Sequence, residues 1–436
     1  MLLLFCLTTI AWGQRLTLTP SLTLAERYDD NIFQSRTDKT DDFVTTISPS
    51  IRLQYLSTEP TPDTRLELNY RMAFEAFADH SSQNQLAHYF SSSLTSQLAP
   101  SLSVQLRELL IVTEEPFERD ERLSDPTGLR PASQQQRART IRNEIQSGLD
   151  VRLSGRITLG VRFGSLIEDV SIPQELDEFR YTVGTDLGYV VNVARASRLL
   201  ATYQIAFHTF RDNGIILLDN SSAAFNVHTF SAGIQHELTP TLAVNAALGY
   251  NFTTSDVTLN DGHEAIFADV KLTKTFHTGT ASLGYLRHFF SGQGNGRVIL
   301  ADTVRAAVAV NLTGKLTARL DSNISWADFQ GPTIIDRNQY FGSIRPSVTY
   351  YILRPWNVSV GYAYEHTHYT DKATGDITDH RLLLGTQFAL RDWLLLGLSY
   401  RYASRSIDGN ATVNEVTNFA RNQFSLTVTA APNLRF

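Results

Sequence analysis

The residues best suited to metal chemistry are two histidines, His366 and His368, which are separated by a single threonine. In an extended strand, side chains two residues apart lie on the same face, so this pair could hold a metal ion. The other interpretation is a pair of polar residues where a strand meets its loop. The sequence offers no third ligand in the same pattern, and we therefore predict no metal site and no cofactor.

Motifs for catalysis are absent from the sequence. It contains no Gly-x-Ser-x-Gly elbow, no His-Glu-x-x-His pair and no cysteine spacing for a metal, since Cys6 is the only cysteine. The formal net charge of −6 argues against a nucleic-acid partner. The sequence therefore predicts a protein that is not an enzyme.

Alternation of apolar and polar residues is the dominant pattern, and it is clearest from Asn422 to Phe436. A period of two predicts a strand, and about ten residues are enough for a tilted strand to cross a bilayer. One face of this stretch carries Phe424, Leu426, Val428, Ala430, Pro432, Leu434 and Phe436. The stretch resembles the closing strand of bacterial outer-membrane barrels, in which the final aromatic residue belongs to the signal read by the insertion machinery. We expect Phe436 to be that signal.

The same alternation recurs from Arg15 onward, for example over residues 66–74, 179–189 and 394–402. It slips near Glu108 and again at Arg287, and we interpret each slip as a bulge or a strand end. Short links alternate with longer polar ones along nearly the whole chain, as in outer-membrane barrels. The chain has no apolar run of about twenty residues for a membrane helix, and only helices and closed barrels satisfy their backbone in lipid.

These observations predict an all-β fold. It is a transmembrane up-and-down antiparallel β-barrel of about twenty strands (range 18–22), without a plug domain, over residues 14–436. A β-propeller or β-solenoid would show blade motifs or glycine-punctuated repeats, which the sequence does not have.

The two strand faces differ in chemistry. The apolar face, with tyrosines near its ends, should meet outer-membrane lipid, and the charged face should point inward. Two interpretations of the inner charges remain open and can coexist: they line a water-filled lumen, or they pair across strands and stiffen the wall. The predicted lumen-lining residues are Arg65, Glu67, Arg71, Glu75, Arg142, Glu144, Asp150, Arg152, Arg180, Asp186, Arg319, Asp321, Arg345 and Arg401.

The N-terminal segment Met1–Gly13 is apolar, like the core of a signal peptide, and we expect cleavage between Gly13 and Gln14. The usual positive n-region is missing, so either the start codon lies further upstream or the segment is not a signal peptide. The longest link, from Glu114 to Gln136, either folds into the lumen as a constriction or stays outside the barrel.

The first fifty residues resemble a known family. A strand from Leu18 to Leu24 leads into Tyr28-Asp29-Asp30-Asn31-Ile32-Phe33, and a second strand contains Ser48-Pro49-Ser50. This opening is similar to that of the β-barrel porins related to the outer-membrane proteins of exopolysaccharide systems. The resemblance implies a wide barrel in the bacterial outer membrane that could serve as an exit for a secreted polysaccharide.

We therefore expect a porin-like channel for small hydrophilic solutes or polysaccharide. Its other expected partners are membrane lipid and the barrel-insertion machinery. The alternative is a structural or adhesive barrel with a closed lumen, whose extracellular loops bind a partner.

Overall fold

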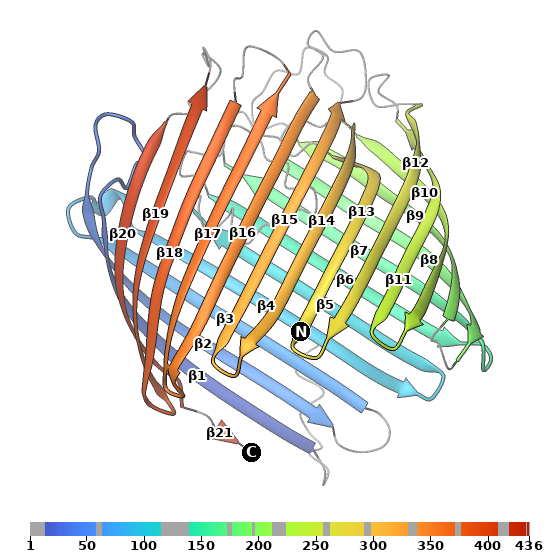
Figure 1. The fold of residues 1–436 in the computed structure, drawn as a ribbon, viewed down its shortest axis with the longest axis horizontal. Helices are drawn as coiled ribbons and strands as arrows, with labels where there is room; N and C mark the ends of the chain where they lie inside the picture. The colour runs from blue at the N-terminus through green and yellow to red at the C-terminus, as the bar shows by residue number, and fades with distance from the viewer. Residues whose placement is uncertain are drawn as a thin grey trace.

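The chain folds into one closed β-barrel (Figure 1). The computed structural model describes residues 14–57, 63–114, 139–171, 177–193, 197–211, 224–255, 262–291, 298–329, 338–370, 376–408, 418–432 and 434–435. The predicted signal peptide, its cleavage residue Gly13 and the predicted insertion signal Phe436 lie outside these residues. Gln14 opens the first strand.

The strands are long, mostly between 12 and 16 residues. The first ten are β1 (Gln14–Asp29), β2 (Asp42–Ser57), β3 (Asp63–Phe77), β4 (Gln85–Ala99), β5 (Leu102–Thr113), β6 (Thr140–Arg152), β7 (Ile157–Val170), β8 (Asp177–Asn192), β9 (Ser197–Arg211) and β10 (Phe225–Thr239). The others are β11 (Leu242–Thr254), β12 (Glu264–Phe276), β13 (Gly279–Ser291), β14 (Val298–Thr313), β15 (Leu316–Phe329), β16 (Asn338–Leu353), β17 (Trp356–Tyr369), β18 (Asp376–Arg391), β19 (Leu394–Asp408), β20 (Phe419–Ala430) and β21 (Leu434–Arg435).

Each strand pairs antiparallel with its neighbours in sequence, and β1 closes the ring by pairing with β20 and β21. The two-residue β21 continues β20 after a break, so the wall has twenty strands. The predicted up-and-down barrel is confirmed. Within the described residues there is no plug domain, and a single 3-10 turn, η1 (Ser81–Gln83), is the one helical element.

The last strand is less continuous than predicted. Pairing between β20 and β1 ends at Ala430, and β21 resumes only at Leu434. Pro432 lies in the break, and a proline cannot donate a ladder hydrogen bond. No helix in the described part of the chain has the length and hydropathy needed to cross a bilayer.

Short and long connections alternate as predicted, and the short ones gather at one rim (Figure 1). Six pairs of neighbouring strands show a register shift beside the short turn that joins them, for example between Glu237 and Thr239. Bulges are common at barrel rims, where they bend the strand and increase its twist.

The outer face is apolar, as at Leu248 and Ile266, which are 62% and 64% exposed. Glu108 interrupts this face in the middle of β5. It pairs with Ser92 on one side and Ile145 on the other, without a register shift at either. The predicted bulge at Glu108 is therefore wrong: the strand is regular, and its carboxylate lies on the lipid-facing side.

The tip of the β13–β14 hairpin leaves the wall. Pairing of β13 with β12 ends at Arg287, although β13 continues to Ser291 and stays paired with β14 throughout. The predicted strand end at Arg287 is thus wrong for β13 itself, but Arg287 marks the point where β13 separates from β12. Its guanidinium lies 2.7 Å from Asp302 of β14.

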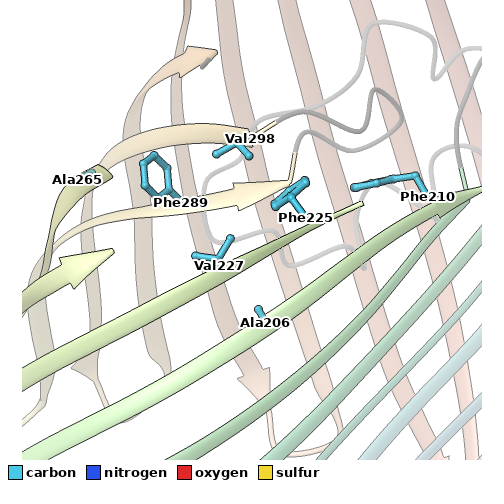
Figure 2. Close-up of a cluster of buried hydrophobic side chains, with 7 residues drawn as sticks. All are labelled: Ala206, Phe210, Phe225, Val227, Ala265, Phe289 and Val298. Carbon is cyan, nitrogen blue, oxygen red and sulfur yellow. The ribbon is translucent and has the colours of Figure 1, made fainter. Parts of the chain in front are cut away.

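The largest apolar cluster is formed where this tip docks (Figure 2). Phe289 of β13 and Val298 of β14 pack against the wall residues Ala206, Phe210, Phe225, Val227 and Ala265. These wall residues belong to β9, β10 and β12. The largest apolar cluster is therefore the contact between an inward-folded hairpin and the nearby wall of β9, β10 and β12.

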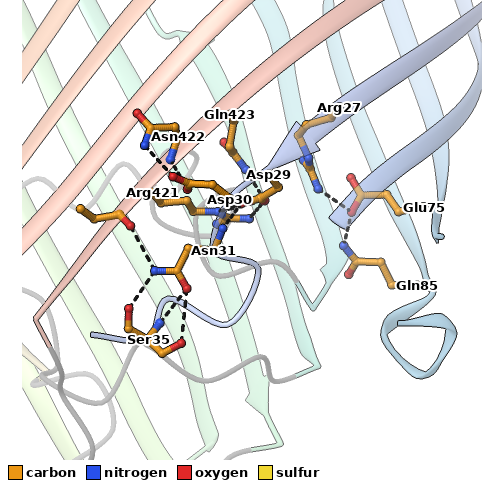
Figure 3. A network of polar contacts seen from close by, with 11 residues as sticks. Arg27, Asp29, Asp30, Asn31, Ser35, Glu75, Gln85, Arg421, Asn422 and Gln423 are labelled. Atoms are coloured by element: carbon orange, nitrogen blue, oxygen red, sulfur yellow. Dashed lines mark hydrogen bonds and ion pairs between the residues drawn. The ribbon is translucent and has the colours of Figure 1, made fainter. Parts of the chain in front are cut away.

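A buried ion pair joins the first and last strands (Figure 3). The guanidinium of Arg421 donates to both carboxylate oxygens of Asp29, with Nε–Oδ distances of 2.8 and 3.0 Å. Both side chains are almost completely buried, at 2% and 0% exposed. The amide of Gln423 also donates to Asp29, at 2.9 Å. The seam of the barrel is thus closed by side chains as well as by the backbone ladder.

The neighbouring residues of the Tyr-Asp-Asp-Asn segment extend this clamp. The backbone and side-chain amides of Asn422 both donate to Asp30, each at 2.6 Å. Asn31 donates to the backbone carbonyls of Ala420 and Ser35 (Figure 3). The segment that carries the family resemblance therefore has a structural role, which is to bind the closing strand.

Replacing Arg421 with alanine should strongly destabilise the barrel. Removing one partner of a buried ion pair leaves the other charge uncompensated, which costs about 3–5 kcal/mol. The exposed pair between Arg52 and Glu67 is the matched control, and Arg52→Ala should cost about 1 kcal/mol or less. Urea unfolding of the refolded protein in lipid vesicles measures both values. Equal losses would contradict a special role for the seam.

Replacing Glu108 with leucine should stabilise the barrel by about 1–2 kcal/mol, because it removes a carboxylate from the lipid-facing side. This gain is smaller than the roughly 2–4 kcal/mol that a lipid-facing Lys or Arg costs at the bilayer midplane. Leu106→Glu, one position along the same face, should destabilise it by a similar amount. The same unfolding assay in vesicles measures both. A loss of stability in Glu108→Leu would show that something outside the barrel binds the carboxylate.

Candidate functional site

The inner face of the wall is identified by a contact across the barrel. Ser291 at the end of β13 donates a hydrogen bond of 2.6 Å to Glu178 of β8. These strands are not neighbours in the wall, so the side chain of Glu178 must point into the interior. Residues paired across neighbouring strands lie on the same face of the sheet, so the strand registers identify the inner-facing residues of every strand from Glu178 onward.

All of the predicted lumen residues lie on this inner face, opposite the exposed apolar side chains. On β3, for example, Glu67 and Arg71 alternate with the outer residues Tyr70 and Phe74. The same holds for Arg65, Glu75, Arg142, Glu144, Asp150, Arg152, Arg180, Asp186, Arg319, Asp321, Arg345 and Arg401.

Many of these charges pair across strands. Arg142 lies 3.5 Å from Glu168 of β7, and it also lies 3.4 Å from Glu144 of its own strand. The other predicted residues in such pairs include Glu67 with Arg52, Glu75 with Arg27, Asp150 and Asp186 with Arg162, and Arg345 with Glu365. Cross-strand pairing is therefore a real part of the inner wall, whether or not water also reaches it.

Glycines on the inner face leave room for long side chains. Arg162 reaches Asp150 at 2.5 Å and Asp186 at 3.3 Å, and in doing so it passes over Gly148. A Cβ atom at Gly148 would come within 2.9 Å of the Arg162 guanidinium. Gly148 therefore leaves the space that the Arg162 side chain occupies on the inner wall.

The hairpin tip is fastened to the wall by polar contacts. Glu178, which accepts from Ser291, also lies 3.2 Å from Nδ1 of His208, and both Glu178 and His208 are buried. Two groups near the tip lack partners: the side-chain amide of Asn251 and Nδ1 of His288 are buried without hydrogen bonds. Buried polar groups without partners cost about 1–3 kcal/mol each, so they offset part of the apolar docking.

A cavity of about 370 Å³ lies between the tip and the wall. The tip contributes His288, Phe289 and Phe290. The wall contributes residues of β6 to β10, among them Gln146, Arg162, Arg180, Thr182, Gln204 and His208. We call this cavity the recess.

Sequence reasoning did not predict the inward hairpin. It considered only the link from Glu114 to Gln136 as a constriction, and residues 115–138 of that link lie outside the described part of the chain. The one signal was the charge at Arg287, which breaks the apolar face where β13 leaves β12.

The histidine pair lies on the outer face. His368 pairs with Tyr340 of β16, and His366 pairs with Thr378 of β18, so both side chains point away from the interior. His368 lies 2.6 Å from Asp376, and His366 lies 3.9 Å from the same carboxylate. No group of three metal-ligating side chains suited to an ion is present among the described residues.

Comparisons with known proteins agree on the fold. No family model matches the sequence, and no curated protein matches it. A mutant of the ferric enterobactin receptor PfeA from Pseudomonas aeruginosa matches at 9% identity, covering 95% of this chain and 80% of that one, with a TM-score of 0.56. The closed form of the ferric-catecholate import receptor Fiu from E. coli K12 matches at 9% identity, covering 95% and 81%, with a TM-score of 0.51.

A third structure, Pseudomonas aeruginosa OpdK with vanillate, covers 97% of this chain and 99% of that one at 11% identity. Its TM-score of 0.42 is too low to support an argument. At the identities of the other two matches, the likeness shows the fold alone: the chain has the closed-barrel architecture of bacterial outer-membrane proteins.

Replacing Phe289 with alanine should release the hairpin tip without unfolding the barrel, because Phe289 is the tip's largest side chain in the apolar cluster. Hydrogen exchange read by mass spectrometry should show faster exchange at residues 288–291. Phe207→Ala removes an outward-facing ring from β9 and is the control, for which exchange at the tip should not change. Unchanged exchange in Phe289→Ala would mean that the cluster does not hold the tip.

Proposed function

We propose that the chain is an outer-membrane channel for hydrophilic solutes. The observation that carries this proposal is the division of one closed barrel into an apolar outer face and a charged inner face. Exposed side chains such as Leu248 and Ile266 fit lipid, which only helices and closed barrels can span. Barrels of about sixteen to eighteen strands already enclose an aqueous channel, and this one has twenty.

The inner-face charges belong to the same proposal. Arg319 is exposed on the inner side of β15, where it pairs with Ala309 near the short-turn end of β14, whereas the docked tip lies at the other end of that strand. A charge of this kind is favourable only in contact with water or a counter-charge. The predicted lumen residues would then line the water-filled part of the barrel, and their cross-strand pairs would keep the wall rigid.

The hairpin tip would be the narrow part of the channel. It crosses from β13 to the inner side of β8, β9 and β10, where the apolar cluster and the bond between Ser291 and Glu178 hold it. A constriction built from the wall itself would restrict passage without a separate plug domain.

A narrower form of the proposal assigns the channel to the export of a secreted polysaccharide. Its support is the resemblance of the first fifty residues to barrels of exopolysaccharide systems. The structure gives that segment a role in closing the barrel, so the resemblance bears on the architecture more directly than on the solute.

The docked tip also favours an alternative, a structural or adhesive barrel whose lumen stays closed. In that case the contact between Ser291 and Glu178 would be permanent, and the loops would bind a partner outside the cell. Solute passage separates the two functions.

Single-channel conductance in planar bilayers is the deciding experiment. Ser291→Cys and Glu178→Cys, in a chain with Cys6→Ser, allow a cleavable thiol crosslinker to fix the tip to the wall. The refolded wild-type protein should give steady steps. The crosslinked variant should conduct less than the same variant after cleavage.

Silence from folded, heat-modifiable wild-type protein would contradict the channel and favour the closed barrel. Steady conductance that the crosslink does not change would keep the channel but remove the hairpin as its constriction.

A further inference from the structure

The arginines around the recess differ in how well they are neutralised. Arg162 pairs with Asp150 and Asp186, as described above. Arg180, on the inner face of β8, makes no salt bridge with any residue of the described chain. The nearest carboxylate along its own strand face, Glu178, is already bound by His208 and Ser291. Arg180 therefore brings to the recess a guanidinium that no carboxylate of the described residues approaches within salt-bridge distance, although the charges of Glu178 and of the lining residue Glu144 lie nearby.

The surroundings of Arg180 leave space for a ligand. Its neighbour on the same face, Thr182, pairs with Gly164 of β7, and Gln204 of β9 pairs with Gly184 of β8. These glycines place no side chain on the wall between the polar groups. The volume of about 370 Å³ lies at the lower end of the roughly 300–1,000 Å³ found for ligand pockets.

A second observation also points to a missing partner. Nδ1 of His288 is buried without a hydrogen bond, and His288 lines the recess from the hairpin side. Buried polar atoms are nearly always satisfied by protein, water or ligand. Arg180 on the wall and His288 on the tip therefore border one cavity, and the unsatisfied Nδ1 atom of His288 is buried beside it.

We propose that the recess binds a carboxylate group of a solute, with Arg180 as the recognising cation. A guanidinium forms two parallel hydrogen bonds with a carboxylate, and Thr182 and Gln204 can bind neighbouring hydroxyl groups. The same carboxylate could belong to an acidic saccharide or to a small organic acid. The inference rests on the proposed channel only for the route by which the solute arrives, because binding can be measured without conduction.

Isothermal titration calorimetry on the refolded full chain in detergent tests the site. The probes are trigalacturonate, monomeric galacturonate and citrate, with neutral maltotriose as the uncharged comparison. At low salt, at least one carboxylate probe should bind and maltotriose should not. Arg180→Gln should weaken that binding tenfold or more. Arg52→Gln, which removes a charge from the inner face of β2, should change it less than twofold.

Each outcome decides the proposal. Tighter binding of trigalacturonate than of the small acids would identify a saccharide, and the reverse would identify an organic acid. No binding of any carboxylate probe, equal binding of maltotriose, or equal loss in both variants would overturn the site. Binding that depends on Arg180 in a barrel that never conducts would contradict the channel but keep the carboxylate site. Conduction without binding of any carboxylate probe would support the channel and overturn the carboxylate site.

Discussion

Closure of the ring is the constraint on which the rest of the structure depends. In lipid, every backbone N–H and C=O group must find a partner within the protein, so an unpaired edge at β1 or β20 is not allowed. The closing pairs run from Leu22–Ala430 to Asp29–Gln423. The buried pair of Asp29 and Arg421 stands at the end of this ladder. A slip of one residue would break that pair and turn an apolar face inward, so the clamp selects one register.

At the hairpin the wall gives up pairing that closure would otherwise require. Residues 264–267 of β12 and 288–291 of β13 belong to strands but do not pair with each other. Such a gap is tolerated where the backbone borders the interior of the protein instead of lipid. The apolar cluster around Phe289 and Val298 offsets the lost ladder, while unsatisfied groups such as Asn251 limit the gain. The stability of the docked tip is thus the difference between an apolar gain and the cost of lost pairing and unsatisfied polar groups.

The period-two pattern was sufficient to predict the strands, their faces and their approximate number, because an apolar face toward lipid and a polar face toward the interior require alternating residue types. It could not predict the hairpin, since parity places Phe289 with the outer residues Leu283 and Tyr285. Phe289 is buried inside because the whole strand end turns inward, and that depends on partners in β9 and β10 far away in the chain. The prediction of a bulge at Glu108 was wrong for a different reason. A regular strand accommodates this polar residue, although the break in the alternation indicated an irregular one.

The recess and the docking of the tip share one set of charges. Glu178 binds Ser291 of the tip and lies two residues from Arg180 on the same strand face. A carboxylate held by Arg180 would place a second negative charge beside Glu178, and like charges at close range repel. That repulsion acts between the solute and Glu178, so it lowers the affinity of the recess for a carboxylate, whereas the neutral hydroxyl donor Ser291 is not repelled. The neighbouring charges on one face of β8 therefore limit how tightly Arg180 can hold an anion.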